Sequence, residues 1–275
     1  MLERSISFTK GAGVISHNAR DFLTDNVDKD RVQNNIEYCN EKIKDVYHEL
    51  FDDALQRYNQ KQKRADRKIE NYYEKIRSGK QEKTFHEIII QVGNCENMNS
   101  KTPDGELAER ILDEYYQDFQ KRNPYLKVFS AHLHMDEATP HLHIDFVPFT
   151  TKSKRGLDTR VSLKQALANQ GFVGNSKHET EWSLWVESEK EALSKVMERY
   201  GVEWEQKGKH KKHLSVLEYK CKRMEEVVDI LTTQKQELEA VATEQAQMIV
   251  LAKAEIEQVR TERDTLRDQN SITRT

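Results

Sequence analysis

The stretch Ala131–Pro148, AHLHMDEATPHLHIDFVP, decides how the rest of the chain is interpreted. It contains four of the ten histidines as two pairs, His132 with His134 and His141 with His143. Side chains two apart on an extended strand point to the same face of a sheet. The residues MDEATP between the pairs suit a connection between two strands. Two strands joined there would bring three or four imidazoles to one point, which is the outline of a metal site.

Length and composition set broad limits. A chain of 275 residues can form one large or two modest domains. Net charge is only -3, so DNA binding would need local clusters of Lys and Arg. Three cysteines (Cys39, Cys95, Cys221) form no CxxC pair, which favours a reducing cytosol over a disulfide scaffold. No apolar run reaches the roughly 18 residues of a membrane span. We therefore expect a soluble, cytoplasmic protein.

The hydrophobic pattern changes period repeatedly along the first 200 residues. We expect strands at residues 4–10, 84–92, 126–134 and 141–149. We expect helices at about 17–23, 40–75, 105–122, 161–170 and 181–200. Ser16 would cap the first helix, and the two histidine strands would pair as neighbours, carrying His134 toward His141. This order predicts an α+β fold, a mainly antiparallel sheet covered by helices on one side.

A different pattern follows the basic stretch Lys207–His213, KGKHKKH. From Leu217 onward apolar residues keep a seven-residue repeat, with a phase shift near Met248 and no Gly or Pro before Asn270. Sustained heptads predict a coiled coil, and one thin apolar seam needs a partner, so we expect a homodimer. The alternative is a single charged helix that folds back on the first domain. We place a folded domain, a basic linker and a coiled-coil dimerisation region at residues 1–203, 204–213 and 214–275.

Local clusters of positive charge are candidate contacts to DNA phosphates, which need no base-specific geometry. One cluster lies in the predicted helix 40–75 and contains Lys61, Lys63, Arg64, Arg67 and Lys68. A second follows the last histidine strand and contains Lys152, Lys154 and Arg155. The ordinary alternative for such a charge run is a solvated surface.

Histidines with neighbouring acids can bind a divalent transition metal, because imidazole suits Zn, Mn, Ni or Cu. Three protein ligands would leave positions open, which marks a catalytic site rather than a structural one. The HLHMDE segment also invites comparison with the HxHxDH motif of metallo-β-lactamase-like hydrolases. Glu137 stands where that motif has its last histidine, so a small-molecule hydrolase is a minor alternative.

The combination of HMDEATPHLH at His134–His143 with HNAR at His17–Arg20 closely resembles relaxases of the MobV type, the plasmid mobilisation proteins also called plasmid recombination enzymes. The H-apolar-H pair of His141 and His143 is similar to the motif of the HUH endonuclease superfamily. The resemblance covers about residues 1–200. It implies a ferredoxin-like HUH fold and a site- and strand-specific transesterification at a plasmid transfer origin. The implied partner is plasmid DNA, as a single-stranded or hairpin origin.

The resemblance also implies roles for individual residues. By position, the metal ligands are His134, His141 and His143, the acid of the motif is Glu137, and the nucleophile with its companion are His17 and Arg20. The family favours Mn²⁺, with Mg²⁺ as the other candidate. Because other HUH enzymes use tyrosine as nucleophile, Tyr38 and Tyr47 remain alternatives. His132 has no counterpart and is either a partner of a ligand or a same-face neighbour.

The implied chemistry is physically consistent. A divalent cation neutralises charge that builds on the nonbridging phosphate oxygens. A covalent protein–DNA bond conserves the energy of the broken linkage, so the strand can be rejoined without ATP. A neutral His17 could attack, Arg20 could hold phosphate through its planar fork, and Asp136 or Glu137 could orient a ligand imidazole. The competing hypothesis is a dimeric DNA-binding protein or repressor at a plasmid origin that does not cleave.

Overall fold

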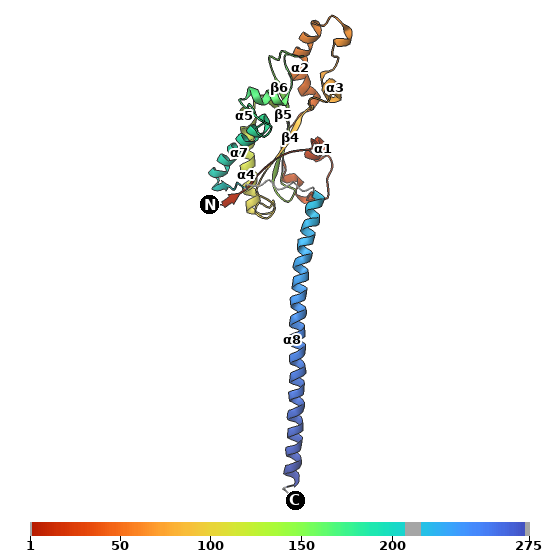
Figure 1. Cartoon of the computed structure of the whole chain (residues 1–275), viewed down its shortest axis with the longest axis vertical. Coiled ribbons are helices and arrows are strands. Elements are labelled where there is room, and N and C mark those ends of the chain that lie inside the picture. Colours follow the sequence, from red (N-terminus) through yellow and green to blue (C-terminus); the bar gives the residue numbers. More distant parts are fainter. Residues whose placement is uncertain (1, 207–215, 273–275) are drawn as a thin grey trace. The chain divides into compact units, whose positions relative to one another are not determined.

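The computed structural model describes residues 2–206 and 216–272 (Figure 1). By its internal contacts the chain divides into two compact units, Met1–Gly208 and Lys209–Thr275. The predicted basic stretch Lys207–His213 lies outside the described residues. No helix in the described ranges is long and apolar enough to cross a membrane.

The first unit mixes strands with helices and short 3-10 turns. Its strands are β1 (Leu2–Arg4), β2 (Ile6–Lys10), β3 (Ile36–Asn40), β4 (His86–Val92), β5 (Leu126–His134), β6 (His141–Thr150), β7 (Arg160–Val161) and β8 (Val202–Trp204). Its helical segments are α1 (Ile15–Asn18), η1 (Lys29–Asn34), α2 (Ile43–Gln60), η2 (Ala65–Arg67), α3 (Tyr72–Ser78), α4 (Pro103–Gln117), α5 (Phe119–Arg122), α6 (Leu163–Asn169) and α7 (Glu181–Arg199).

Most predicted elements coincide with observed ones. β5 has the predicted bounds, β6 extends one residue further than expected, and β4 begins two residues later. The helices expected at 105–122, 161–170 and 181–200 correspond to α4 with α5, to α6 and to α7. The first expected strand is divided at Ser5 into β1 and β2, which belong to different sheets.

The helix predicted at 40–75 is wrong in its second half. α2 ends at Gln60, and the chain leaves the helical path until α3. The cause lies at Asn59, whose side-chain amide donates to the carbonyl of Ile69 (2.7 Å) and accepts from its backbone N–H (2.9 Å). This closed loop places the Ile69 side chain in the core beneath α2. The basic residues of the first cluster therefore lie in an exposed loop rather than on a helix face.

Two further expectations are corrected near the N-terminus. α1 begins at Ile15 with Val14 as its N-cap, so Ser16 lies within the helix instead of capping it. The helix begins earlier than predicted because the backbone N–H of Gly13 donates to the carboxylate of Glu87 (2.6 Å) and so fixes the chain just before α1. No strand was expected at Ile36–Asn40, yet this segment forms the edge strand β3.

The central sheet contains six strands. Its order is β2-β4-β6-β5-β3, with every neighbouring pair antiparallel, and β7 pairs with β6. The predicted pairing of β5 with β6 is confirmed, with His134 opposite His141 and His132 opposite His143. β1 and β8 form a separate parallel pair.

One face of this sheet is apolar and covered by helices. Residues of α4, α5, α6 and α7 pack on it, and Figure 1 shows α4, α5 and α7 together on one side of the strands. α2 and α3 cover only one end of the other face, where Phe51 and Tyr72 pack with Phe129 and Val147. The predicted α+β class, with a mainly antiparallel sheet covered by helices, is confirmed. The remainder of the second face carries the polar residues of the histidine stretch.

A β-bulge in β5 decides which side chains reach that polar face. The pairing with β6 shifts between Val128 and Ser130, which makes Phe129 the extra residue. Val128 lies in the core beneath the helices, whereas Phe129 lies in the core under α2. Because side chains alternate along a strand, one extra residue moves all later residues to the opposite face. The histidines of β5 consequently share a face with those of β6.

The second unit contains the long helix α8 (Val216–Ile272), as the sequence predicts. Apolar residues of the heptad pattern are half or more exposed on it, for example Val227 (50%), Leu231 (57%) and Leu238 (70%). A continuous apolar seam in contact with water favours association with another helix. Coiled-coil dimerisation remains a prediction.

A buried carboxylate links α4, α5 and α7. Glu189 accepts hydrogen bonds from the Tyr115 hydroxyl (2.5 Å), Asn123 Nδ2 (2.9 Å) and Arg122 Nη2 (3.1 Å). The Asn123 carbonyl oxygen in turn accepts from Trp185 Nε1 (2.7 Å). The contacts of the Glu189 carboxylate join α7 to α4 and to the end of α5, so the network fixes how the helical layer fits together.

Replacement of Glu189 by alanine should destabilise the first unit. The change leaves the half-buried Arg122 cation and the Tyr115 hydroxyl without their acceptor, which typically costs about 3 kcal/mol. Urea unfolding measured by circular dichroism checks this, with Glu187→Ala as the control because Glu187 is exposed on the same helix. Equal unfolding midpoints for the two variants would contradict the prediction.

Candidate active site

Three imidazoles converge on the polar face of the sheet. The ring centroids of His134, His141 and His143 lie 4.6–5.2 Å apart. One nitrogen from each ring lies within 4.8 Å of the other two. The three predicted metal ligands are thus brought together by the β5–β6 pairing.

Two of these rings donate an N–H to backbone oxygens. His134 Nε2 lies 2.8 Å from the carbonyl oxygen of Asn18, and His141 Nδ1 lies 2.8 Å from that of Thr139. A carbonyl oxygen can only accept, so these nitrogens carry the protons. The other nitrogen of each ring, His134 Nδ1 or His141 Nε2, is the one left to coordinate a metal ion.

The third ring is held by a carboxylate. His143 Nδ1 lies 2.6 Å from Glu87 Oε1, and Glu87 also accepts from the Gly13 backbone N–H (2.6 Å) and Asn18 Nδ2 (2.8 Å). Burial alone would raise the pKa of Glu87, but the hydrogen bonds from His143, Gly13 and Asn18 hold its pKa below the ordinary value. The carboxylate is therefore charged, fixes the tautomer of His143 and raises the basicity of its free Nε2.

The free lone pairs fit a divalent metal ion. Within the described residues, His134 Nδ1 and His143 Nε2 are buried and lack a hydrogen-bond partner, a costly state for polar atoms. Burial lowers the pKa of His143 to about 4 and also lowers the pKa of His134, so both rings are neutral at neutral pH. Neutral imidazoles with lone pairs at one point form a three-ligand metal set that leaves coordination positions open.

His17 lies beside this cluster on α1. Its ring centroid is 6.0 Å from that of His134 and 6.2 Å from that of His143. Its Nε2 is 3.8 Å from Glu137 Oε1. Burial, followed by the positive charge of Arg20, lowers the pKa of His17 below its ordinary value. The ring is therefore neutral at neutral pH, the state that a nucleophile requires.

Arg20 is fixed by the two acids of the histidine loop. Its Nε and Nη2 donate to the two carboxylate oxygens of Asp136 (2.8 and 2.5 Å), and Nη2 also donates to Glu137 (2.9 Å). Its Nη1 lies 3.3 Å from His17 Nε2, which must be the acceptor because a guanidinium only donates. Arg20 has φ of 59°, a conformation that non-glycine residues rarely adopt and that these contacts hold in place.

Three polar residues of the site were missed by the sequence reasoning. Asn18 is 2% exposed, and its side chain donates to Glu87 (2.8 Å) and Asp145 (3.0 Å) while its carbonyl accepts from His134. Burial, followed by the charge of Glu87, raises the pKa of Asp145 to about 7. The sequence contained a signal for Glu87, because burying a carboxylate within an apolar central strand is costly unless hydrogen-bond donors surround it.

His132 does not join the metal cluster. Its Nδ1 faces the exposed Glu37 on β3 at 3.8 Å, and its ring centroid lies 6.3 Å from that of His134. His132 is therefore best interpreted as a neighbour on the same face of the sheet.

The alternative tyrosine nucleophiles have other hydrogen-bond partners. The Tyr38 hydroxyl donates to Asp113 on α4 (2.8 Å), and the buried Tyr47 hydroxyl donates to the Thr84 carbonyl (2.7 Å). Burial raises the pKa of both hydroxyls well above the ordinary value. Neither side chain belongs to the network of the histidine cluster in the described structure, which favours His17.

The basic residues of both predicted clusters are exposed in loops. Arg64 forms an ion pair with Asp66 (2.6 Å) in the first loop. In the second, Lys152 and Arg155 line a depression of about 480 Å³ together with Arg160. All eight predicted DNA-contacting residues are thus available at the surface, outside the histidine network.

The chain resembles known proteins in sequence and in structure. No curated protein matches it. The Mn-bound MobM relaxase domain (MOBV; Mob_Pre) with 22-nucleotide pMV158 oriT DNA shares 21% identity, with 79% of this chain and 98% of that chain covered and a TM-score of 0.47. A MobM structure with 26-nucleotide oriT DNA shares 20% identity, with 79% of this chain and 99% of that chain covered and a TM-score of 0.39.

The family model of the plasmid recombination enzymes (Mob_Pre) matches residues 14–221, well over half of the sequence. The chain belongs to the plasmid recombination enzyme family.

Proposed function

We propose that the chain is a relaxase that cuts and rejoins one DNA strand at a specific site in a plasmid transfer origin, with a divalent metal and a covalent bond to the 5′ phosphate. Family membership supports this role in plasmid mobilisation and recombination. The convergence of three imidazole lone pairs beside a neutral His17 carries the proposal. A dimeric DNA-binding protein without cleavage activity would have no use for this arrangement. The proposed setting is the cytoplasm.

The metal would be held by His134 Nδ1, His141 Nε2 and His143 Nε2. A bound divalent cation would neutralise charge on the nonbridging oxygens of the scissile phosphate. Three imidazoles would hold Zn²⁺ as well as Mn²⁺, so we propose Mn²⁺ from the family rather than from the ligand set, with Mg²⁺, which prefers all-oxygen ligands, as the weaker alternative.

His17 is the proposed nucleophile. The lone pair of its Nε2 forms a bond to phosphorus, and the bond from phosphorus to the 3′ oxygen breaks. The 3′ oxygen leaves with that electron pair and takes up a proton, while the Nδ1 proton of the phosphorylated ring passes to solvent. The reverse sequence rejoins the strand.

Arg20 and the loop acids prepare this attack. The contact of Arg20 Nη1 with His17 keeps the lone pair on Nε2, and the same guanidinium can turn one N–H to a phosphate oxygen when DNA binds. Glu137 and Asp136 hold the guanidinium in place through its other nitrogens. Glu137 therefore acts through Arg20 and His17, in keeping with its position in the motif.

The remainder of the chain would hold DNA and join two copies. We propose that the basic loops at Lys61–Lys68 and Lys152–Arg155 contact phosphates along the origin. We further propose a catalytic domain at 1–203, a linker at 204–213 and a coiled-coil dimerisation region at 214–275.

Replacement of His17 by alanine should abolish the covalent adduct and slow nicking by on the order of 10³-fold or more, because the nucleophile is lost. Binding to the origin should stay within about twofold. The assay uses supercoiled plasmid carrying its own origin, with Mn²⁺ present or omitted, and His48→Ala as control because His48 is exposed on α2. A covalent adduct that persists in the His17 variant would indicate that a tyrosine is the nucleophile. Origin binding by the natural chain without nicking in Mn²⁺ would favour the non-cleaving alternative.

Replacement of Glu87 by glutamine should weaken metal binding about 10- to 100-fold, since the charged acceptor behind His143 is removed. Titration calorimetry with Mn²⁺ measures this directly. Glu106→Gln makes the same chemical change at an exposed residue of α4 and should leave the affinity unchanged. Equal affinities for the two variants would show that Glu87 has no role in metal binding.

The natural chain should be a dimer in solution, and Leu231→Asp with Leu238→Asp should convert it to a monomer, because both changes place charge in the heptad seam. Light scattering after size-exclusion chromatography reports the mass. Thr233→Asp with Ala240→Asp adds the same charge outside the seam of α8 and should remain dimeric. A monomeric natural chain would contradict the proposal.

A further inference from the structure

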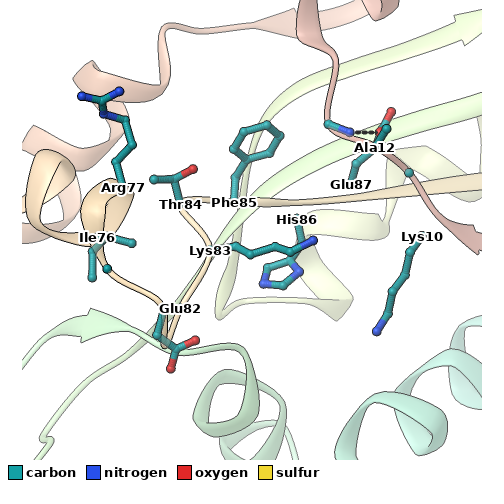
Figure 2. A pocket seen from close by; sticks show the side chains of 13 residues that line it. Lys10, Ala12, Ile76, Arg77, Glu82, Lys83, Thr84, Phe85, His86 and Glu87 are labelled. Carbon is teal, nitrogen blue, oxygen red and sulfur yellow. Dashed lines mark hydrogen bonds between the residues drawn. The ribbon is translucent and has the colours of Figure 1, made fainter.

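A second concave site adjoins the histidine cluster. It has a volume of about 330 Å³ and lies where β2 ends and β4 begins. Figure 2 shows Lys83 extending past the ring of His86 on the side where Lys10 lies, with Phe85 and Arg77 on the other side. We call it the Lys10–Lys83 pocket.

Its two lysines lack carboxylate partners. In the described part of the chain neither Lys10 nor Lys83 has an acid within ion-pair distance, and Lys10 Nζ instead lies 4.3 Å from the ring centroid of Trp182. Burial, followed by the nearby positive charge of Lys83, lowers the pKa of Lys10, as expected for two cations that repel each other. An anion between them would remove this repulsion.

The acids near the pocket are engaged elsewhere. Glu82 lies 3.9 Å from Arg160. The Glu87 carboxylate accepts hydrogen bonds from Gly13, Asn18 and His143. Three cations, Lys10, Arg77 and Lys83, line the pocket against these two acids, so its formal charge is slightly positive although acids outnumber Lys and Arg in the chain as a whole.

The pocket and the histidine cluster share a wall. The loop after β2 packs on Glu87: Gly11 N–H donates to the Glu87 carbonyl (3.0 Å), and a Cβ on Gly11 would lie 1.9 Å from the Glu87 carboxylate. The same Glu87 side chain holds His143. Lys10 and His86 belong to the helix-covered side of the sheet, so a DNA strand lying over the histidines would reach the pocket by passing around the end of β2 across this glycine loop.

We propose that the Lys10–Lys83 pocket binds a phosphate of the single-stranded DNA that continues from the scissile phosphate. This inference rests on the proposed nicking function and extends it to a second phosphate site that positions the strand. The two lysines supply charge without a base-specific geometry, so the site holds the backbone of any sequence. Trp182 keeps Lys10 in position for this contact.

The test is fluorescence anisotropy of the full chain with a fluorescein-labelled single strand of about 20 nucleotides of mixed sequence, titrated at several salt concentrations without metal. Lys10→Gln with Lys83→Gln should weaken binding severalfold and reduce the slope of log K against log salt by about 0.7 to 1.4, the value for one to two lost phosphate contacts. Lys10→Arg with Lys83→Arg keeps the charge and should keep most of the slope.

A matched pair of exposed lysines controls for overall charge. Lys121→Gln with Lys195→Gln makes the same change on α5 and α7, outside the pocket. If the pocket pair gives the same affinity and salt slope as this control pair, the inference is overturned, even where the natural chain nicks its origin. A reduced slope in a chain that never nicks would support the phosphate site while the proposed nicking function fails. A natural chain that binds no single strand would refute both.

Discussion

The register between β5 and β6 is the constraint on which the histidine cluster depends. His134 stands opposite His141, and a slip of one residue would turn the imidazoles of one strand toward the helix-covered face. The bulge at Phe129 lets β5 place both Val128 and Ala131, three residues apart, in the core beneath the helices. Each buried apolar side chain contributes roughly 1.5–3 kcal/mol, so a slipped register that exposed several of them would cost far more than any single hydrogen bond. The apolar pattern thus fixes the register, and the register brings the three proposed ligands together.

The proposed nucleophile, His17, is held by a weaker element. α1 has only four residues, too few for a helix to be stable by itself. Its position depends on Asn18, whose buried side chain and carbonyl contact Glu87, Asp145 and His134. Leaving such a buried polar group unsatisfied costs about 1–3 kcal/mol, so α1 has one favoured position on the sheet. Because Glu87 also holds His143, one carboxylate sets both the ligand and the helix that carries His17.

The sequence was sufficient for the parts of the site that follow from local pattern. The alternation of histidines placed β5, β6 and their loop, and the HNAR motif located His17 and Arg20. The sequence was insufficient for features that depend on a contact between residues far apart in the chain. The break of the helix after Gln60 depends on Asn59 closing on Ile69, and the role of Glu87 depends on Asn18 and His143 arriving from other elements. The bulge at Phe129 likewise depends on packing against two apolar clusters that form only when the chain folds.

The net charge of -3 conceals how the charges are arranged. The acids nearest the histidines are engaged within the protein: Asp136 pairs with the Arg20 cation, and the charged Glu87 carboxylate accepts hydrogen bonds from three residues. Burial and the neighbouring Glu87 raise the pKa of Asp145 to about 7, so part of its negative charge is removed as well. The cations of the adjoining pocket, Lys10 and Lys83, have no such partners in the described structure. A DNA strand at the proposed site would therefore meet neutral imidazoles and two lysines without carboxylate partners in the described structure. Because salt screens charge interactions beyond a short range, this local arrangement of charge matters more for DNA binding than the net charge of the chain.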